Sequence, residues 1–456
     1  MTTSPPALTA VPPVSRNFLR FSPLETRFQI AHTPTPAQPH TMAGTTAATV
    51  AVIINHWNQT PYKDFSSHML NFTKRRILVP NASCSWASKM VLNPALTADP
   101  QDPDTLYMLF RSTGPWEQAT IPGKPLPYPI FLGLGISRDG GENWDFDFSR
   151  PALAPQLLYN RQEFDDKLLR NGKMFDYSNG CIEDPRLFYF ENQLYLTVAC
   201  RAFPPGPYWE HDEPAQCQPD WVKDAPELGP AVLENRTATM LFRVDLEALK
   251  ARDYDHAFTM IAPLHQPDVS DDRDVVLFPR RLKIDGRDRI VCIHRPKTPW
   301  NYPEGRACTA PSIFLALADD LQDFHAGKAE EHLFAVPKYP WEANRIGPSW
   351  APIELTQGKW LLPYHGKQDD AVGYTQSFMI LEEQPAGLPK ITRRPAGRML
   401  FADLPWELEG DFTIPCLFTC SGVICPDGTL LMGYGAADRV VGLVSCNFQE
   451  LLDTLK

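Results

Sequence analysis

Hydrophobic stretches typical of a strand, a turn and a second strand recur along the chain. Each unit opens on apolar residues, passes through a turn and closes on a strand-like segment that ends in a polar residue. In the first four units, 13 to 17 positions separate the opening proline from the closing polar residue. The five units run from Leu92 to Arg111, from Glu183 to Arg201, from Leu277 to Arg295, from Trp350 to His365 and from Leu417 to Asp438.

This repeat predicts an all-β fold, a five-bladed β-propeller with long inserted loops. Successive units begin about 70 to 94 residues apart, which exceeds the ~45 residues of a compact propeller blade, so loops must be inserted between strands. The segment Ser137–Trp144 carries Asp-Gly-Gly and predicts a tight hairpin of the kind found in outer blade strands. A β-sandwich is the alternative fold for this pattern.

The polar residues that recur in the units are expected to meet in one place. Inner strands of a propeller converge on a central funnel, so residues at the same point of each repeat come together although they are far apart in sequence. This predicts a single site rather than scattered surface positions. The recurring residues are Arg111, Asp184, Arg201, Arg295, His365 and Asp438.

Two segments fall outside the repeat. Residues 1–60 are rich in Pro, Thr and Ala with little periodicity, which predicts a loose or disordered N-terminal extension before a catalytic propeller domain at 61–456. Phe203–Glu234 is a long insertion after the second unit that contains Trp209 and Trp221. This insertion either narrows the acceptor side of the site or decorates the surface.

Composition and charge exclude several function classes. The chain has 456 residues and a formal net charge of −11, which disfavours nucleic acid and anionic membranes as partners. No GxSxG, P-loop or helix-opening GxGxxG is present, and the ten cysteines show no spacing suited to zinc, so we expect no metal and no cofactor. The N-terminus lacks the pattern of a secretory signal, which favours a cytoplasmic location. A homo-oligomer is compatible with the sequence.

The expected funnel would hold one candidate acid among several cations. A carboxyl that acts as an acid needs a raised pKa, which burial supplies and neighbouring arginines oppose. Bound phosphate would neutralise those arginines. The side chains of Arg273, Arg295, Arg345 and His365 suit this role because guanidinium groups pair bidentately with phosphate oxygens. In the alternative, each arginine caps a strand or pairs with a carboxylate.

At this point the residues resemble glycoside hydrolase family 130, the β-mannoside phosphorylases and related β-mannosidases. The resemblance covers about residues 76–445 and implies a five-bladed propeller. It rests on five ordered motifs, namely Gly180-Cys-Ile-Glu-Asp-Pro-Arg186, Asp274-Val-Val-Leu-Phe-Pro279 with His294-Arg295-Pro296, Arg345-Ile-Gly-Pro348, Trp360-Leu-Leu-Pro-Tyr-His-Gly366 and Tyr434-Gly-Ala-Ala-Asp438.

The resemblance also implies a mechanism. Asp184 would be the general acid, acting through the 3-hydroxyl of the bound mannosyl unit, while phosphate attacks the anomeric carbon from the opposite face with inversion. The implied phosphate-binding residues are Arg273, Arg295, Arg345, His365 and Tyr374. The implied mannosyl-binding residues are Asn93, Arg111 and Asp438.

The expected activity is therefore inverting, reversible phosphorolysis of a mannose-containing oligosaccharide, which gives mannose 1-phosphate and a shortened acceptor sugar. Family hydrolases place acidic residues where this chain has its basic set. A β-mannosidase that uses water is the alternative, followed by a non-catalytic carbohydrate-binding propeller. Arg273 and Arg345 stand where many family members have lysine, and Ser349–Ala351 replaces a Gly/Pro-rich segment. The acceptor sugar and the linkage are left open by the sequence.

Overall fold

The computed structural model describes residues 70–114, 128–169, 174–205, 217–297, 310–369, 372–410 and 414–456. These residues all belong to one compact unit, Val50–Lys456. The expected N-terminal extension at 1–60 lies outside the described residues. The described part of the chain is mostly β with little helix, and none of its helices is long and apolar enough to cross a membrane.

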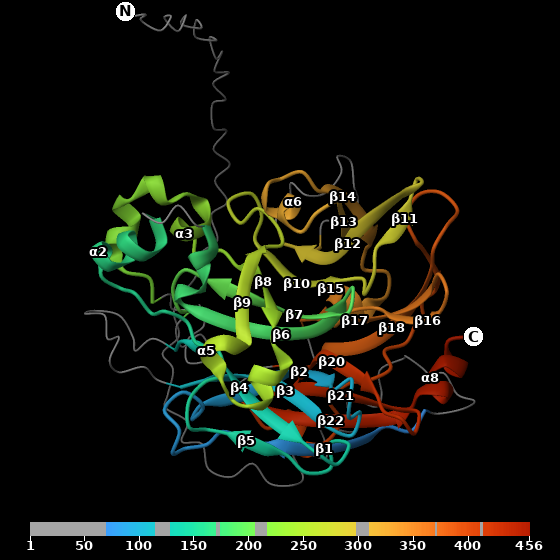
Figure 1. Cartoon of the computed structure of the whole chain (residues 1–456). Coiled ribbons are helices and arrows are strands. Elements are labelled where there is room, and N and C mark those ends of the chain that lie inside the picture. Colours follow the sequence, from blue (N-terminus) through green and yellow to red (C-terminus); the bar gives the residue numbers. More distant parts are fainter. Residues whose placement is uncertain are drawn as a thin grey trace, which may run out of the picture. The chain divides into compact units, whose positions relative to one another are not determined.

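The strands of the described residues form four sheets, the largest of which combines two antiparallel meanders, so that there are five meanders in all. Figure 1 shows their arrangement. The first contains β2 (Met90–Ala98), β3 (Leu106–Thr113), β4 (Ile130–Ser137) and β5 (Asp145–Asp147), and the second β6 (Cys181–Phe190), β7 (Gln193–Arg201), β8 (Ala238–Val244) and β9 (Phe258–Pro263). The third contains β10 (Asp272–Leu277), β12 (Arg287–Pro296), β13 (Ile313–Ala318) and β14 (Glu330–Ala335), with β11 (Leu282–Ile284) paired to β12.

The fourth meander contains β15 (Arg345–Pro348), β17 (Lys359–Gln368), β18 (Gly373–Glu382) and β19 (Lys390–Arg393), with β16 (Ile353–Thr356) paired to β17. The fifth contains β20 (Leu417–Ile424), β21 (Thr429–Ala436) and β22 (Val440–Asn447), and its outer strand is the N-terminal β1 (Thr73–Leu78). A single parallel pair, Ile130 with Cys181, joins the first two meanders into one sheet. The pairing of β1 with β22 ties the two ends of the described chain together.

Helical segments of the described residues are short, and all except α8, which follows β22, lie between strands. They are α2 (Arg161–Phe164), η2 (Asp165–Leu169), η3 (Met174–Asn179), η5 (Asp220–Asp224), η6 (Pro226–Leu228), α3 (Pro230–Leu233), α4 (Leu246–Lys250), α5 (Tyr254–Ala257), α6 (Gln322–His325), η8 (Pro340–Glu342), α7 (Pro405–Leu408) and α8 (Phe448–Thr454). None is long enough to be stable without packing on the sheets.

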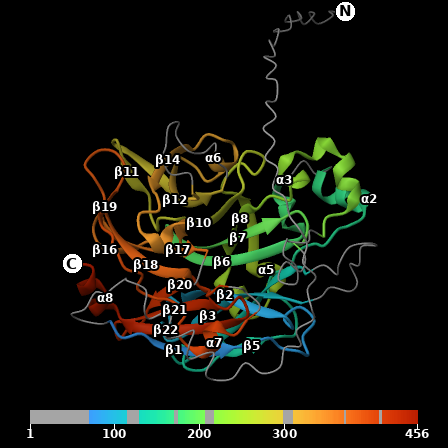
Figure 2. The same ribbon diagram turned by 180° about the vertical axis from the view of Figure 1, so that it is seen from behind.

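The first strands of the meanders lie next to one another. β2 contacts β6 and β20, β6 contacts β10 and β20, and β10 contacts β15. Figure 2 shows β2, β6, β10 and β20 near the centre of the view from the opposite side. The strands β3 and β4 are buried along their whole length, which explains why they read as continuous hydrophobic runs rather than alternating ones. Polar residues on the first strands are therefore brought together inside the protein.

The strand–turn–strand units predicted from the sequence are confirmed, and so is the hairpin over Ser137–Trp144, which joins β4 to β5. The opening strands of the third and fourth units were placed too late. β10 and β15 end at Leu277 and Pro348, before the prolines at 279 and 352 that marked these units. Proline has no N–H to donate to a strand ladder, so these two prolines follow the first strand instead of opening it.

Candidate functional site

Three first strands carry a polar residue in the left-handed region at the same kind of irregularity. Asn93 (φ +45°), Asp184 (φ +53°) and Asp274 (φ +60°) each follow the last regular pair before a bulge in β2, β6 and β10. A bulge leaves its extra residue unpaired and re-aims its side chain, and Asn and Asp tolerate this conformation better than most residues. Asn93 and Asp184 were predicted site residues, whereas Asp274 was not, because the late placement of the third unit hid its equivalence.

Asp184 is the centre of a first cluster. Its Oδ1 accepts a hydrogen bond from Asn93 Nδ2 at 2.7 Å and one from Arg111 Nη1 at 2.9 Å. All three side chains are buried. The structure therefore brings the predicted acid together with two of the three predicted mannosyl-binding residues.

Glu183 links this cluster to further arginines. Its carboxylate lies 3.1 Å from Arg111 Nη1, 3.6 Å from Arg201 Nε and 3.0 Å from Arg273 Nη2. Burial by itself would raise the pKa of the Glu183 carboxyl, but the three arginines outweigh it and lower this pKa to about 2. Arg273, a predicted phosphate-binding residue, is thus engaged with a carboxylate, and Glu183 is a site residue that the sequence reasoning missed.

Replacing Glu183 by glutamine is expected to destabilise the protein by about 3–5 kcal/mol, because it leaves buried guanidinium groups without their counter-charge. Urea unfolding measures this loss. Since the folded pKa is depressed, the carboxylate's contribution is complete above the unfolded value of about 4.3 and is lost as the pH falls towards about 2. As a control, Glu330→Gln removes an exposed carboxylate whose partner Arg289 keeps Asp319 as a counter-charge, so it should change stability less. Equal losses in the two variants would contradict the assignment.

Asp274 is the centre of a second cluster. Its Oδ1 accepts from Arg186 Nη2 at 2.8 Å, while its Oδ2 accepts from Arg295 Nε at 2.5 Å and lies 3.4 Å from His365 Nε2. Burial would raise the pKa of Asp274, but Arg295, Arg186 and His365 hold it well below its usual range. Pairing of Arg295 with a carboxylate was the alternative to a phosphate role, and this pairing exists. His365, however, is not packed elsewhere but faces the same carboxylate.

Two polar atoms in this second cluster are buried and make no hydrogen bond within the described part of the chain. They are Arg295 Nη1 and His365 Nε2. The distance of 3.4 Å between His365 Nε2 and Asp274 Oδ2 is longer than that of a good hydrogen bond. Burial lowers the pKa of His365 despite the neighbouring Asp274. A buried donor without a partner is rare, so Arg295 Nη1, beside the loosely held His365 Nε2, marks a place where a ligand with oxygen acceptors would fit.

The remaining predicted phosphate-binding residues border this second cluster. The Tyr374 ring lies 6.1 Å from the His365 ring, and burial raises the Tyr374 pKa to about 12. Arg345 Nε donates to Asn344 Oδ1 at 2.6 Å. Burial lowers the pKa of Arg345, and the like charges of Arg295 and Arg273 lower it further. Arg345 therefore lies within electrostatic range of the same cations.

Asp438 lies in the turn that follows β21, in the left-handed region (φ +50°), and is within electrostatic range of the first cluster. Burial raises its pKa, Arg111 opposes this, and the charges of Asp184 and Glu183 add to it. Cys416 Sγ donates to Asp438 Oδ1 at 3.4 Å. The charges of Arg111, Asp184 and Glu183 therefore act on Asp438. This places Asp438 close enough to the first cluster to contact the same ligand.

Arg186 connects the two clusters. Its Nη1 donates to the Asp184 carbonyl at 3.0 Å, and its Nη2 donates to Asp274. Its Nε donates to the Ser349 carbonyl at 2.9 Å, so all three guanidinium nitrogens have protein partners. This arginine was quoted within a motif but given no role, and the structure assigns it to holding β6 against β10 and the segment after β15.

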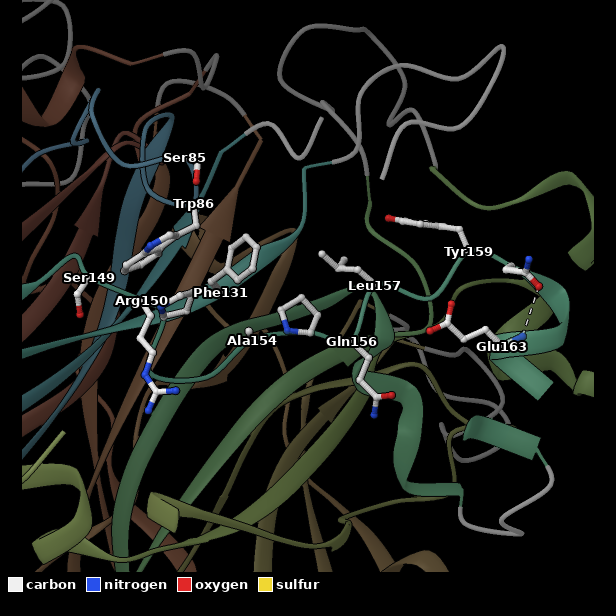
Figure 3. Close-up of a pocket in the computed structure, with 13 residues that line it drawn as sticks. Ser85, Trp86, Phe131, Ser149, Arg150, Ala154, Gln156, Leu157, Tyr159 and Glu163 are labelled. Atoms are coloured by element: carbon white, nitrogen blue, oxygen red, sulfur yellow. Dashed lines mark hydrogen bonds between the residues drawn. The ribbon is translucent and has the colours of Figure 1, made fainter. Parts of the chain in front are cut away.

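A separate pocket of about 650 Å³ is lined by none of the predicted site residues (Figure 3). Trp86, Phe131, Leu157 and Tyr159 are among its lining residues. The nearby part of the 203–234 insertion is structural, because the Trp221 ring packs 5.4 Å from the Phe164 ring within the apolar core. Trp209, the other tryptophan of that insertion, lies outside the described residues.

Comparison with known proteins identifies relatives of the second half of the chain. Residues 239–456 match the family model described as beta-1,4-mannooligosaccharide phosphorylase. This stretch includes Asp438 and all five predicted phosphate-binding residues, whereas Asn93, Arg111 and Asp184 precede it.

Two curated proteins are similar over part of their length. The chain is 30% identical over 179 residues to the 1,2-beta-oligomannan phosphorylase of Thermoanaerobacter sp. (strain X514), a match that covers 39% of this chain and 52% of that protein. It is 29% identical over 187 residues to the beta-1,4-mannooligosaccharide phosphorylase of Ruminococcus albus, covering 40% and 50%. The chain thus spans about half the length of the curated relatives it matches.

A solved structure extends the likeness to the fold. The beta-1,2-mannobiose phosphorylase from Listeria innocua, in complex with beta-1,2-mannobiose, superimposes with a TM-score of 0.55 and 17% identity. The superposition covers 85% of this chain and 99% of that one. Its coverage shows that the mostly β fold is shared well beyond residues 239–456.

Proposed function

We propose that the chain is a member of glycoside hydrolase family 130 and that it catalyses the inverting phosphorolysis of β-mannosides, with inorganic phosphate as co-substrate. The products are mannose 1-phosphate and a shortened acceptor sugar, and the reaction is reversible. The two curated relatives are named as phosphorylases of mannose-containing oligosaccharides, which supports this proposal.

The observation that carries the proposal is a pair of buried atoms, Arg295 Nη1 and His365 Nε2, that make no hydrogen bond within the described residues. A phosphate ion offers oxygen acceptors and charge to both. A hydrolase would need a carboxylate there to activate water. Asp274 is the carboxylate beside this pair, and it is already engaged by Arg186 and Arg295. The arrangement therefore favours an anion over water as the nucleophile.

In the proposed reaction, Asp184 supplies the proton and phosphate supplies the electron pair. The proton passes through the 3-hydroxyl of the mannosyl unit to the glycosidic oxygen, whose bond to the anomeric carbon breaks. A phosphate oxygen forms the new bond to that carbon from the opposite face. Asn93 and Arg111 fix Asp184 Oδ1 in place. Asp438 completes the mannosyl-binding set, and Arg273, Arg345 and Tyr374 border the phosphate.

The proposal includes a closed arrangement of the five meanders as the blades of a propeller. It is supported by the contacts of β2 with both β6 and β20, and by the pairing of β1 with β22. In such an arrangement the first strands surround the site. Each cluster would then draw its side chains from several blades, as Asp274 does with partners on β6, β12 and β17.

Release of mannose 1-phosphate from a mannoside is expected only when inorganic phosphate is supplied. Chromatography of the sugar products measures this directly. Free mannose released at an equal rate without phosphate would instead identify a β-mannosidase. No turnover across a panel of mannosides would leave a non-catalytic carbohydrate-binding protein. Synthesis in reverse, from mannose 1-phosphate and a panel of acceptors, identifies the acceptor sugar.

A further inference from the structure

Asp274 occupies an energetically costly position. It is buried and lies in the left-handed region at φ +60°, where a residue other than glycine is strained. Its charge must also be compensated, because an unpaired buried carboxylate is strongly destabilising. The compensation comes from Arg186 on β6, Arg295 on β12 and His365 on β17, all on strands other than its own.

The way in which Asp274 binds Arg295 leaves part of that guanidinium group free. Asp274 Oδ2 takes the Nε–H of Arg295, and Nη1 is left without a partner in the described part of the chain. The guanidinium group is planar because its Nε–Cζ bond does not rotate freely. A hydrogen bond that fixes the Nε–H direction therefore also restricts the direction of Nη1. The same oxygen lies beside His365 Nε2. One carboxylate thus orients both atoms that carry the proposed anion site.

Gly347 on β15 shows how closely these groups are packed. A Cβ at this glycine would lie 2.7 Å from Asp274 Oδ2, 2.8 Å from His365 Cε1 and 2.9 Å from Arg295 Nε. Any side chain would collide with the cluster, so the backbone of β15 closes one side of it. The three groups therefore surround a common point and are restrained from moving apart.

We propose that Asp274 is the positioning residue of the phosphate site, holding Arg295 and His365 in the geometry that binds the co-substrate. This inference rests on the proposed function. Asp274 does not contact phosphate itself, since two negative groups would repel. It acts through the cations that it orients. The opposite expectation follows from charge alone, because removal of a negative charge near an anion site should strengthen anion binding.

Asp274→Asn separates these two expectations. Positioning predicts a KM for phosphate raised about ten- to hundredfold, by analogy with the loss seen when a group that orients a metal ligand is removed. The affinity for mannoside in the absence of phosphate should change less than about twofold. A phosphate KM that is unchanged or lower would overturn the proposal. Initial rates at varied phosphate and isothermal calorimetry with mannoside provide the two readouts.

The matched control is Asp272→Asn, on the same strand. Asp272 is equally buried and lies 2.6 Å from His294 Nδ1, so its loss removes a comparable carboxylate–imidazole contact outside the cluster. It should lower stability without the rise in phosphate KM. A similar rise in both variants would show that Asp274 acts only through general stability, and this result would also overturn the proposal.

Asp274→Glu keeps the test decisive if the asparagine variant fails to fold. It retains the charge but adds a methylene, which moves the carboxylate by about 1.5 Å. Positioning predicts a raised phosphate KM here as well, whereas a purely charge-balancing role predicts rescue. The wild-type enzyme is assayed alongside. Mannose release by the wild type without phosphate would defeat the proposed function, whereas phosphorolysis by the wild type with a normal phosphate KM in Asp274→Glu would defeat this inference alone.

Discussion

Replacing Asp184 by asparagine is expected to lower phosphorolytic turnover about 10²–10⁴-fold, the usual contribution of a general acid. The amide keeps the size of the side chain and an oxygen that can still accept from Asn93 and Arg111, so the fold should survive. What is lost is the proton that the leaving sugar needs. The measurement is the initial rate of mannose 1-phosphate release at saturating phosphate.

Asp147→Asn is the matched control for this prediction. Asp147 is also a buried carboxylate, and it accepts from Tyr254 Oη at 2.6 Å, away from both clusters. Its replacement should cost stability and leave turnover within about twofold. Unchanged turnover in Asp184→Asn would show that the acid has been assigned to the wrong residue, and Asp438, whose pKa burial raises, would be the next candidate.

Much of the fold was predictable because hydrophobic runs and turn residues are local signals. The hairpins β2–β3, β6–β7 and β20–β21 follow directly from them. The first strands of the third and fourth units could not be predicted in this way. β10 and β15 are short, and β11 and β16 separate them from the second strands of their units. A proline that follows a strand cannot be distinguished by sequence alone from one that opens it.

The basic residues of the second cluster could be predicted from the sequence, whereas the carboxylates that hold the arginines of the site could not. Arg295 and His365 close the third and fourth predicted units, and the structure brings them together. Glu183 and Asp274 carried no such signal, because a carboxylate that holds an arginine in place is recognised only through its partner. The left-handed backbone of Asp274 is likewise a property of the bulge in β10 that no local pattern announces.

Replacing Arg295 by alanine is expected to weaken the use of phosphate about ten- to hundredfold, since a charge-assisted hydrogen bond is worth roughly 1.5–3 kcal/mol. Mannoside affinity without phosphate should change little, because the partners of Asp184 are left intact. The loss should therefore be found in the KM for phosphate, measured at saturating mannoside.

Arg289→Ala separates this effect from the loss of a buried arginine. Arg289 lies on the same strand, is equally buried, and pairs with Asp319 and Glu330 at the end of β12 remote from Arg295. Its replacement should lower stability but leave the KM for phosphate unchanged. If both variants raise that KM equally, the effect comes from the strand and not from the anion site. If neither does, the unpartnered Nη1 of Arg295 does not bind the co-substrate, and the choice of phosphate over water loses its structural basis.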